Sequence, residues 1–213
     1  MSPLYPPPGP QSIGRVLDTA FRIFKASAVR CLVLGPLAII SGQTPNIYLL
    51  AIGQPRVSFG GNDPVWWGLY ALGALASLPF TAALIMHQHD IVAGIPTRAI
   101  DKLKKALRGL PALVALTLLM VLLCFVIPGL IAYGGFNLPM TARRPVVIVA
   151  VLLSIYVLVA LSVTWCALLI DRLAGPRALL HSLDLVRGNW WRTLLILAIT
   201  TVVMFVFYFV IIA

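Results

Sequence analysis

A basic segment followed by a long apolar run occurs three times in this chain, and this repeat constrains the fold more than any other feature. The first basic residues of successive copies are offset by 83 residues (98 − 15) and then by 79 residues (177 − 98). In each copy a second basic residue follows ten positions later, which gives the pairs Arg15 and Lys25, Arg98 and Arg108, and Arg177 and Arg187. The apolar runs can cross a hydrocarbon core of about 30 Å at about 1.5 Å per helical residue. The repeat therefore predicts a polytopic membrane protein whose units join an amphipathic helix to membrane spans.

The composition agrees with a membrane protein and argues against a soluble one. Of the 213 residues, 61% are hydrophobic and 10% are charged, whereas soluble domains carry about 25% charged residues. The net charge of +10 does not indicate a nucleic-acid partner, because the basic residues border apolar runs. Cys31, Cys124 and Cys166 lie inside apolar runs, where we expect them to pack as small hydrophobic residues rather than to form disulfides.

The apolar runs predict an all-α, polytopic membrane helical bundle with five spans. We expect the spans at residues 28–50 (with an internal break), 65–89, 110–133, 146–170 and 191–213. They belong to a single integral membrane domain, 12–213, which is built from three repeats, 12–90, 95–171 and 175–213. A Pro-rich segment, 1–11, precedes this domain and is expected to be disordered. The first two repeats hold two spans each and the third holds one. The pseudo-symmetry therefore favours a missing sixth span over a chain that ends at the outer interface.

The distribution of Lys and Arg predicts the orientation. Thirteen of the 16 basic residues lie before or at the beginning of the first span, between spans two and three, or between span four and the beginning of span five. Arg56, Arg143 and Arg144 lie on the opposite side. The positive-inside rule therefore places the N-terminus and all three basic segments in the cytoplasm.

The three basic segments are predicted to form cytoplasmic amphipathic helices in the plane of the membrane interface, because apolar residues recur in them at helical spacing. Thr97 is the expected N-cap of the second helix. Candidate contacts to anionic lipids or to a partner are Arg15, Arg22, Lys25, Arg98, Lys102, Lys104, Lys105, Arg108, Arg177 and Arg187. The alternative is that these helices are topological anchors without a ligand.

Two aspartates also repeat. Asp90 and Asp171 each begin an Asp-x-x-Ala-Gly sequence at the cytoplasmic end of an expected span. The helix dipole disfavours an acid at that end, so we expect equivalent, partly buried sites with a basic partner, which could be Arg98, Arg177 or a residue of the N-terminal helix. A proton or cation site is the alternative.

Other polar residues give weaker indications of a metal-binding or substrate-binding site. His87, His89 and Asp90 could approach His181 and Asp184 and form a metal site, but no specific metal-binding motif is present. We therefore predict interfacial hydrogen bonds there, and neither a metal nor a cofactor. The polar run 41–46 interrupts the first span, as in the broken helices of transporters, although an early helix end explains it equally well.

The stretch from Gly175 to Arg192, GPRALLHSLDLVRGNWWR, resembles a recurrent segment of bacterial six-span membrane domains. These are the glycerophosphoryl diester phosphodiesterase membrane-domain family and its stand-alone relatives. The opening stretch from Ser12 to Arg22, SIGRVLDTAFR, is similar to the start of the same family. The resemblance implies a helical inner-membrane domain. It implies no catalytic residues, because the hydrolase of that family is a separate soluble domain.

These observations predict a non-enzymatic accessory or scaffold protein of the bacterial inner membrane. Its expected partners are the lipid bilayer, anionic lipids and either further copies of the chain or a membrane partner protein. The alternative is a small transporter or lipid-handling protein. A membrane-embedded enzyme is the third class. It would need paired acids or a His/Asp cluster inside a span, and only His87, His89, Asp90 and Asp171 approach that arrangement.

Overall fold

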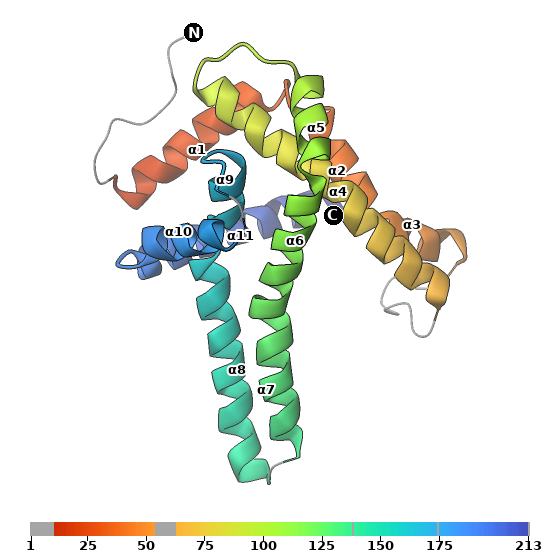
Figure 1. The fold of residues 1–213 in the computed structure, drawn as a ribbon, viewed down its shortest axis with the longest axis vertical. Helices are drawn as coiled ribbons and strands as arrows, with labels where there is room; N and C mark the ends of the chain where they lie inside the picture. Colours follow the sequence, from red (N-terminus) through yellow and green to blue (C-terminus); the bar gives the residue numbers. More distant parts are fainter. Residues whose placement is uncertain (1–10, 54–62, 138, 174, 213) are drawn as a thin grey trace. The chain divides into compact units, whose positions relative to one another are not determined.

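The computed structural model describes residues 11–53, 63–137, 139–173 and 175–212. Helix is the only regular secondary structure in these ranges, which confirms the all-α prediction (Figure 1). Residues 1–10 of the Pro-rich segment and Arg56 lie outside the described residues.

Three helical segments are long and apolar enough to cross a membrane. They are α4 (Pro64–Val92), the continuous run of α6 (Leu110–Val121), η1 (Leu122–Val126) and α7 (Ile127–Phe136), and the run of α8 (Met140–Ala160) and α9 (Thr164–Leu169). Only 28%, 17% and 22% of their most apolar stretches are buried inside the protein. Most of this apolar surface therefore needs another apolar environment, which a lipid bilayer supplies.

The chain divides into two compact units, and the first contains Asp18–Val114. It includes most of α1 (Ile13–Ser27), then α2 (Leu34–Gly42), α3 (Thr44–Ala51), α4 and α5 (Ala99–Arg108). The first expected span corresponds to α2 and α3, which are separated at Gln43. Pro45 lies in the first turn of α3, a position that proline favours because its missing N–H needs no partner there.

Gly73 allows α2 and α4 to approach each other closely. A Cβ atom on Gly73 would lie 2.5 Å from the backbone oxygen of Ser41, at the C-terminal end of α2. The Thr44 hydroxyl donates to the same oxygen at 2.7 Å, so this carbonyl is satisfied where α2 ends. The contact is an example of the close backbone approach that small residues permit between membrane helices.

The second unit contains Gln11–Leu17 and Ala115–Ala213. Within it, α7 and α8 pack side by side (Figure 1), and a Cβ atom on Gly135 would lie 2.7 Å from Cγ1 of Val146. The core of this unit consists of Leu116, Cys124, Leu161 and Leu179.

The break between α8 and α9 is stabilised by α10 (Pro176–Val186), which follows α9 in the chain. The Ser182 hydroxyl donates to the carbonyl of Ala160 at 2.8 Å, which satisfies an acceptor that the helix end leaves without an intrahelical partner. α11 (Trp190–Ile212) follows, and the Trp190 ring stacks on Tyr156 of α8 at 5.7 Å between centroids.

We predict that Gly73→Ala destabilises the protein by about 1–3 kcal/mol, because the added methyl group meets a backbone oxygen that cannot move freely. Gly68 of the same helix has no atom near its virtual Cβ, so Gly68→Ala should cost nothing. Thermal unfolding of both variants in the same detergent checks this. Equal melting temperatures would show that the helices do not approach closely at Gly73.

Candidate functional site

The end of α4 is a sharp reversal that brings α5 back against it. Gly94 has a φ of +72°, which a residue without a Cβ adopts without strain. Its N–H donates to Ile91 O at 3.1 Å, and the N–H of Ile95 donates to Asp90 O at 2.9 Å. This pair of bonds is the Schellman motif, which satisfies the last carbonyls of a helix. The Ala-Gly part of the first Asp-x-x-Ala-Gly copy is therefore a helix stop.

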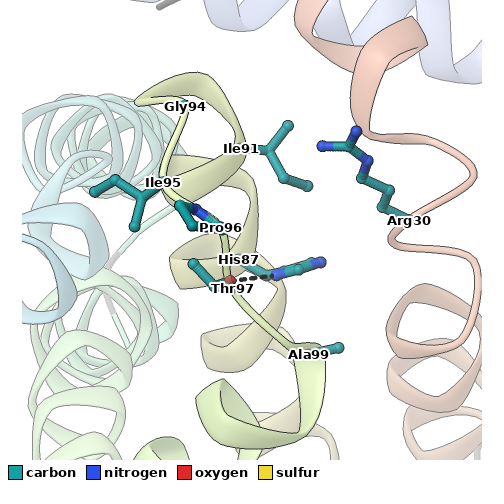
Figure 2. A pocket seen from close by; sticks show the side chains of 8 residues that line it. All are labelled: Arg30, His87, Ile91, Gly94, Ile95, Pro96, Thr97 and Ala99. Atoms are coloured by element: carbon teal, nitrogen blue, oxygen red, sulfur yellow. Dashed lines mark hydrogen bonds between the residues drawn. The ribbon is translucent and has the colours of Figure 1, made fainter. Parts of the chain in front are cut away.

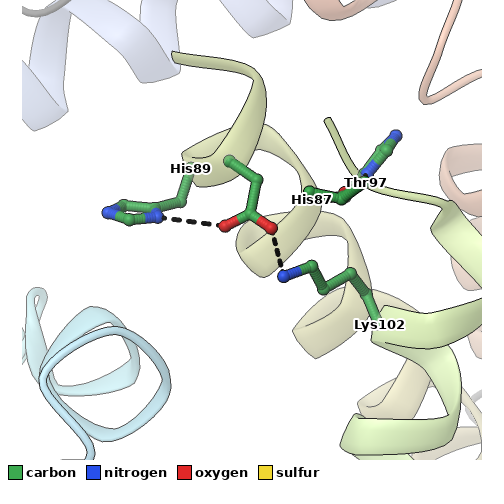
Figure 3. A network of polar contacts seen from close by, with 5 residues as sticks. His87, His89, Thr97 and Lys102 are labelled. Carbon is green, nitrogen blue, oxygen red and sulfur yellow. Dashed lines mark hydrogen bonds and ion pairs between the residues drawn. The ribbon is translucent and has the colours of Figure 1, made fainter. Parts of the chain in front are cut away.

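The Asp90 carboxylate is buried at this helix end and ion-paired with the Lys102 ammonium group from α5 (Figure 3). His89 Nδ1 lies 3.4 Å from the other carboxylate oxygen. The side chains of Asp90 and Lys102 are only 11% and 19% exposed. The expected basic partner of Asp90 thus exists, but it is Lys102 rather than Arg98.

His87 is buried one helical turn before Asp90, and its Nδ1 lies 3.1 Å from the Thr97 hydroxyl oxygen. The sequence pattern suggested that Thr97 caps α5, and this expectation is wrong. The N-cap residue is Arg98, which makes no side-chain capping bond. The Thr97 hydroxyl instead holds a histidine that lies ten residues earlier in the chain.

A cavity of about 680 Å³ opens beside His87 (Figure 2). Arg30, from the segment between α1 and α2, lines it on one side, and the end of α4 lines it on the other. The lining residues are Arg30, His87, Ile91, Gly94, Ile95, Pro96, Thr97 and Ala99. Arg30 lines this cavity although the sequence pattern did not indicate it as a site residue. The available signal was its position, since it is the one basic residue within the first expected span.

The other basic candidates are exposed. On α1 these are Arg15, Arg22 and Lys25, and on α10 they are Arg177 and, at its C-cap, Arg187. On and before α5 they are Arg98, Lys104, Lys105 and Arg108. Lys102 differs from all of them, because its ammonium group pairs with Asp90.

Asp171 does not occupy a site equivalent to that of Asp90. Its side chain is 50% exposed, and Oδ2 lies 3.7 Å from His181 Nε2. α9 ends at Leu169, before Asp171, whereas α4 continues past Asp90 to Val92. The next residue, Arg172, has a φ of +56°, which is unusual for a residue with a side chain. The repeated sequence therefore adopts two different backbone conformations.

The described residues contain no group of three or more His, Cys, Asp or Glu side chains arranged to hold a metal ion. What the end of α4 does present is a neutralised carboxylate and, next to it, a cavity bordered by an arginine, a histidine and a threonine. Such groups can bind an anion through charge and hydrogen bonds.

We predict that Lys102→Met destabilises the protein by about 3 kcal/mol, because it leaves a buried carboxylate without its counter-charge. Lys104→Met, on the exposed face of the same helix, should change stability by less than about 0.5 kcal/mol. Combining Lys102→Met with Asp90→Asn should restore part of the loss. Unfolding measurements in detergent give all three values, and equal effects of Lys102→Met and Lys104→Met would contradict a stabilising ion pair.

No protein family, curated protein or solved structure matches this chain. The resemblance to the bacterial six-span membrane domains therefore stays a prediction, and the function has to be inferred from the geometry of the chain itself.

Proposed function

We propose that this chain is a non-enzymatic accessory or scaffold protein of the bacterial inner membrane, and that its basic cytoplasmic face binds anionic lipid headgroups. The observation that carries the proposal is the surface of α5, where exposed apolar and exposed basic side chains lie next to each other while the helix is tied to the end of an apolar span.

The side chains of α5 divide into three groups. Lys102 and Ala106 are turned toward the protein, the first paired with Asp90 and the second only 2% exposed. Ile100 and Leu107 are 53% and 50% exposed. The basic residues Lys104, Lys105 and Arg108 are exposed as well.

This division suits a helix that lies at the membrane interface. At about 100° per residue, Ile100 and Leu107 lie within about 20° of each other around α5, and Lys104, Arg108 and Lys105 follow at about 40°, 80° and 140° from Ile100. An exposed apolar edge lowers the free energy when it enters the acyl region, and the neighbouring basic groups then meet the headgroups. At about 1 kcal/mol per basic residue near the surface, anionic lipids would be enriched there.

The proposal includes five spans and a cytoplasmic N-terminus. It is supported by three apolar segments of sufficient length and by α11, whose part Trp190–Val203 is also apolar. The asymmetric distribution of Lys and Arg supports the orientation.

A lipid-handling protein is the second candidate. The cavity beside His87 favours it, because a hollow with both apolar and cationic walls suits a lipid better than a flat basic surface does.

Cysteine labelling in intact cells tests the orientation. In a variant whose three native cysteines are replaced, Met140→Cys should react with a membrane-impermeant maleimide, and Lys104→Cys should react only after the cells are opened. Both positions are exposed in the protein, so a difference reports the side of the membrane. The reverse pattern would overturn the orientation and the cytoplasmic basic face together.

Native mass spectrometry of the full chain in mixed micelles tests the basic face. Lys104→Gln with Lys105→Gln should weaken phosphatidylglycerol binding relative to phosphatidylcholine by about 2 kcal/mol, and the difference should shrink as salt rises. Arg143→Gln with Arg144→Gln removes the same charge from the opposite side and is the matched control. Equal losses in both pairs of variants would mean that any basic residue suffices and that α5 has no special role.

A further inference from the structure

The cavity beside His87 has walls of two kinds. Arg30, His87 and Thr97 supply polar groups, whereas Ile91, Ile95 and Pro96 supply apolar surface. None of the eight lining residues is acidic. The neighbouring carboxylate, Asp90, is held by Lys102 and His89 (Figure 3). The charge of the wall is therefore positive, and it is complementary to an anion.

Thr97 fixes the orientation of His87. The hydroxyl lies 3.1 Å from Nδ1, and when it donates to that nitrogen, the neutral ring carries its proton on Nε2. Figure 2 shows the second ring nitrogen on the side away from Thr97, toward Arg30. The ring can therefore donate a hydrogen bond into the space between α4 and the Arg30 segment.

Arg30 complements this donor. Its side chain is exposed, and Figure 2 shows it extending toward Ile91 from the opposite wall. A guanidinium group donates two parallel hydrogen bonds to a phosphate, a geometry that a single ammonium group cannot supply. Ala99, which also lines the cavity, is the first residue of α5, so the positive end of that helix dipole adds to the same potential.

We propose that this cavity is a binding site for the phosphate group of an anionic phospholipid. Arg30 and His87 contact the phosphate, Thr97 positions His87, and the apolar wall contacts the part of the lipid next to the headgroup. The volume of about 680 Å³ is in the range of small-molecule sites, about 300–1,000 Å³. The inference rests on the proposed function, because it names one lipid site on the face that we place at the cytoplasmic interface.

Titration of the full-length protein in neutral detergent tests the site, with binding followed by thermal stabilisation and by calorimetry. The probes are dioctanoyl phosphatidylglycerol, dioctanoyl phosphatidylcholine and inorganic phosphate. We expect phosphatidylglycerol to bind most tightly. Arg30→Gln should weaken it about tenfold or more, the effect of losing charge-assisted hydrogen bonds.

Variants of Thr97 separate positioning from folding. Thr97→Val keeps the shape of the side chain and should weaken binding about threefold, whereas Thr97→Ser keeps the hydroxyl and should restore it. Arg144→Gln is the matched control for charge, because Arg144 is exposed, does not line the cavity and is not one of the candidate lipid contacts. Unliganded melting temperatures and gel filtration show whether each variant is folded.

Four results would overturn the proposal. Binding by Arg30→Gln as tight as that of the unchanged protein would exclude the cavity. An equal loss in Arg144→Gln would reduce the effect to general electrostatics. Equal affinity for inorganic phosphate and for the lipid would rule out a lipid occupant, because the apolar wall would then contribute nothing. If only the Lys104 and Lys105 variants lose lipid binding, the lipid binds to the basic face of α5 and not in the cavity.

Discussion

The arrangement of the first unit depends on the neutralisation of one carboxylate at the end of an apolar helix. Asp90 lies two residues before the last residue of α4, where the helix dipole is negative and the surroundings are apolar, so a carboxylate there needs a counter-charge. Lys102 supplies it from the first turns of α5. That pairing requires the chain to reverse within a few residues, and the Schellman turn at Gly94 performs the reversal. The short return segment then places Thr97 against His87, and the cavity beside His87 is a consequence of the same geometry.

The same requirement, that a polar group in apolar surroundings must find a partner, explains the break in the second unit. α8 ends at Ala160 and α9 begins at Thr164, and no carbonyl freed there can bind water inside a bilayer. Ser182 of α10 satisfies the Ala160 carbonyl. The hydroxyls of Ser162 and Thr164, at the same break, have no hydrogen-bond partner among the described residues. The polar groups at this break are therefore only partly hydrogen-bonded, in contrast to those at the end of α4.

Periodicity and apolar length predicted the long helices well, because both are local properties. The second and third spans were expected at 65–89 and 110–133, and the helices cover Pro64–Val92 and Leu110–Phe136. The break near 161–163 was not predicted, since it contains neither proline nor glycine. The site was predicted less well, because its contacts are tertiary. The local pattern around Thr97 is that of a helix cap, and only the folded chain reveals that His87 competes for its hydroxyl. The prediction that Asp90 and Asp171 occupy equivalent sites was wrong, because the helix continues past Asp90 but ends before Asp171.

The ion pair between Lys102 and Asp90 changes how the basic segment before the third expected span should be interpreted. Four closely spaced basic residues suggest a surface that attracts anionic lipids with its full charge. The Lys102 charge, however, is cancelled locally by Asp90, so that residue stabilises the fold and adds little to the field outside. Lys104, Lys105 and Arg108 remain exposed, and their attraction for lipids is screened within about 10 Å at 0.1 M salt. Buried groups such as His87 are screened much less. Raising the salt concentration should therefore weaken lipid binding at the exposed basic surface before it weakens binding at the proposed phosphate site, and salt is the variable that separates the two proposed modes of lipid contact.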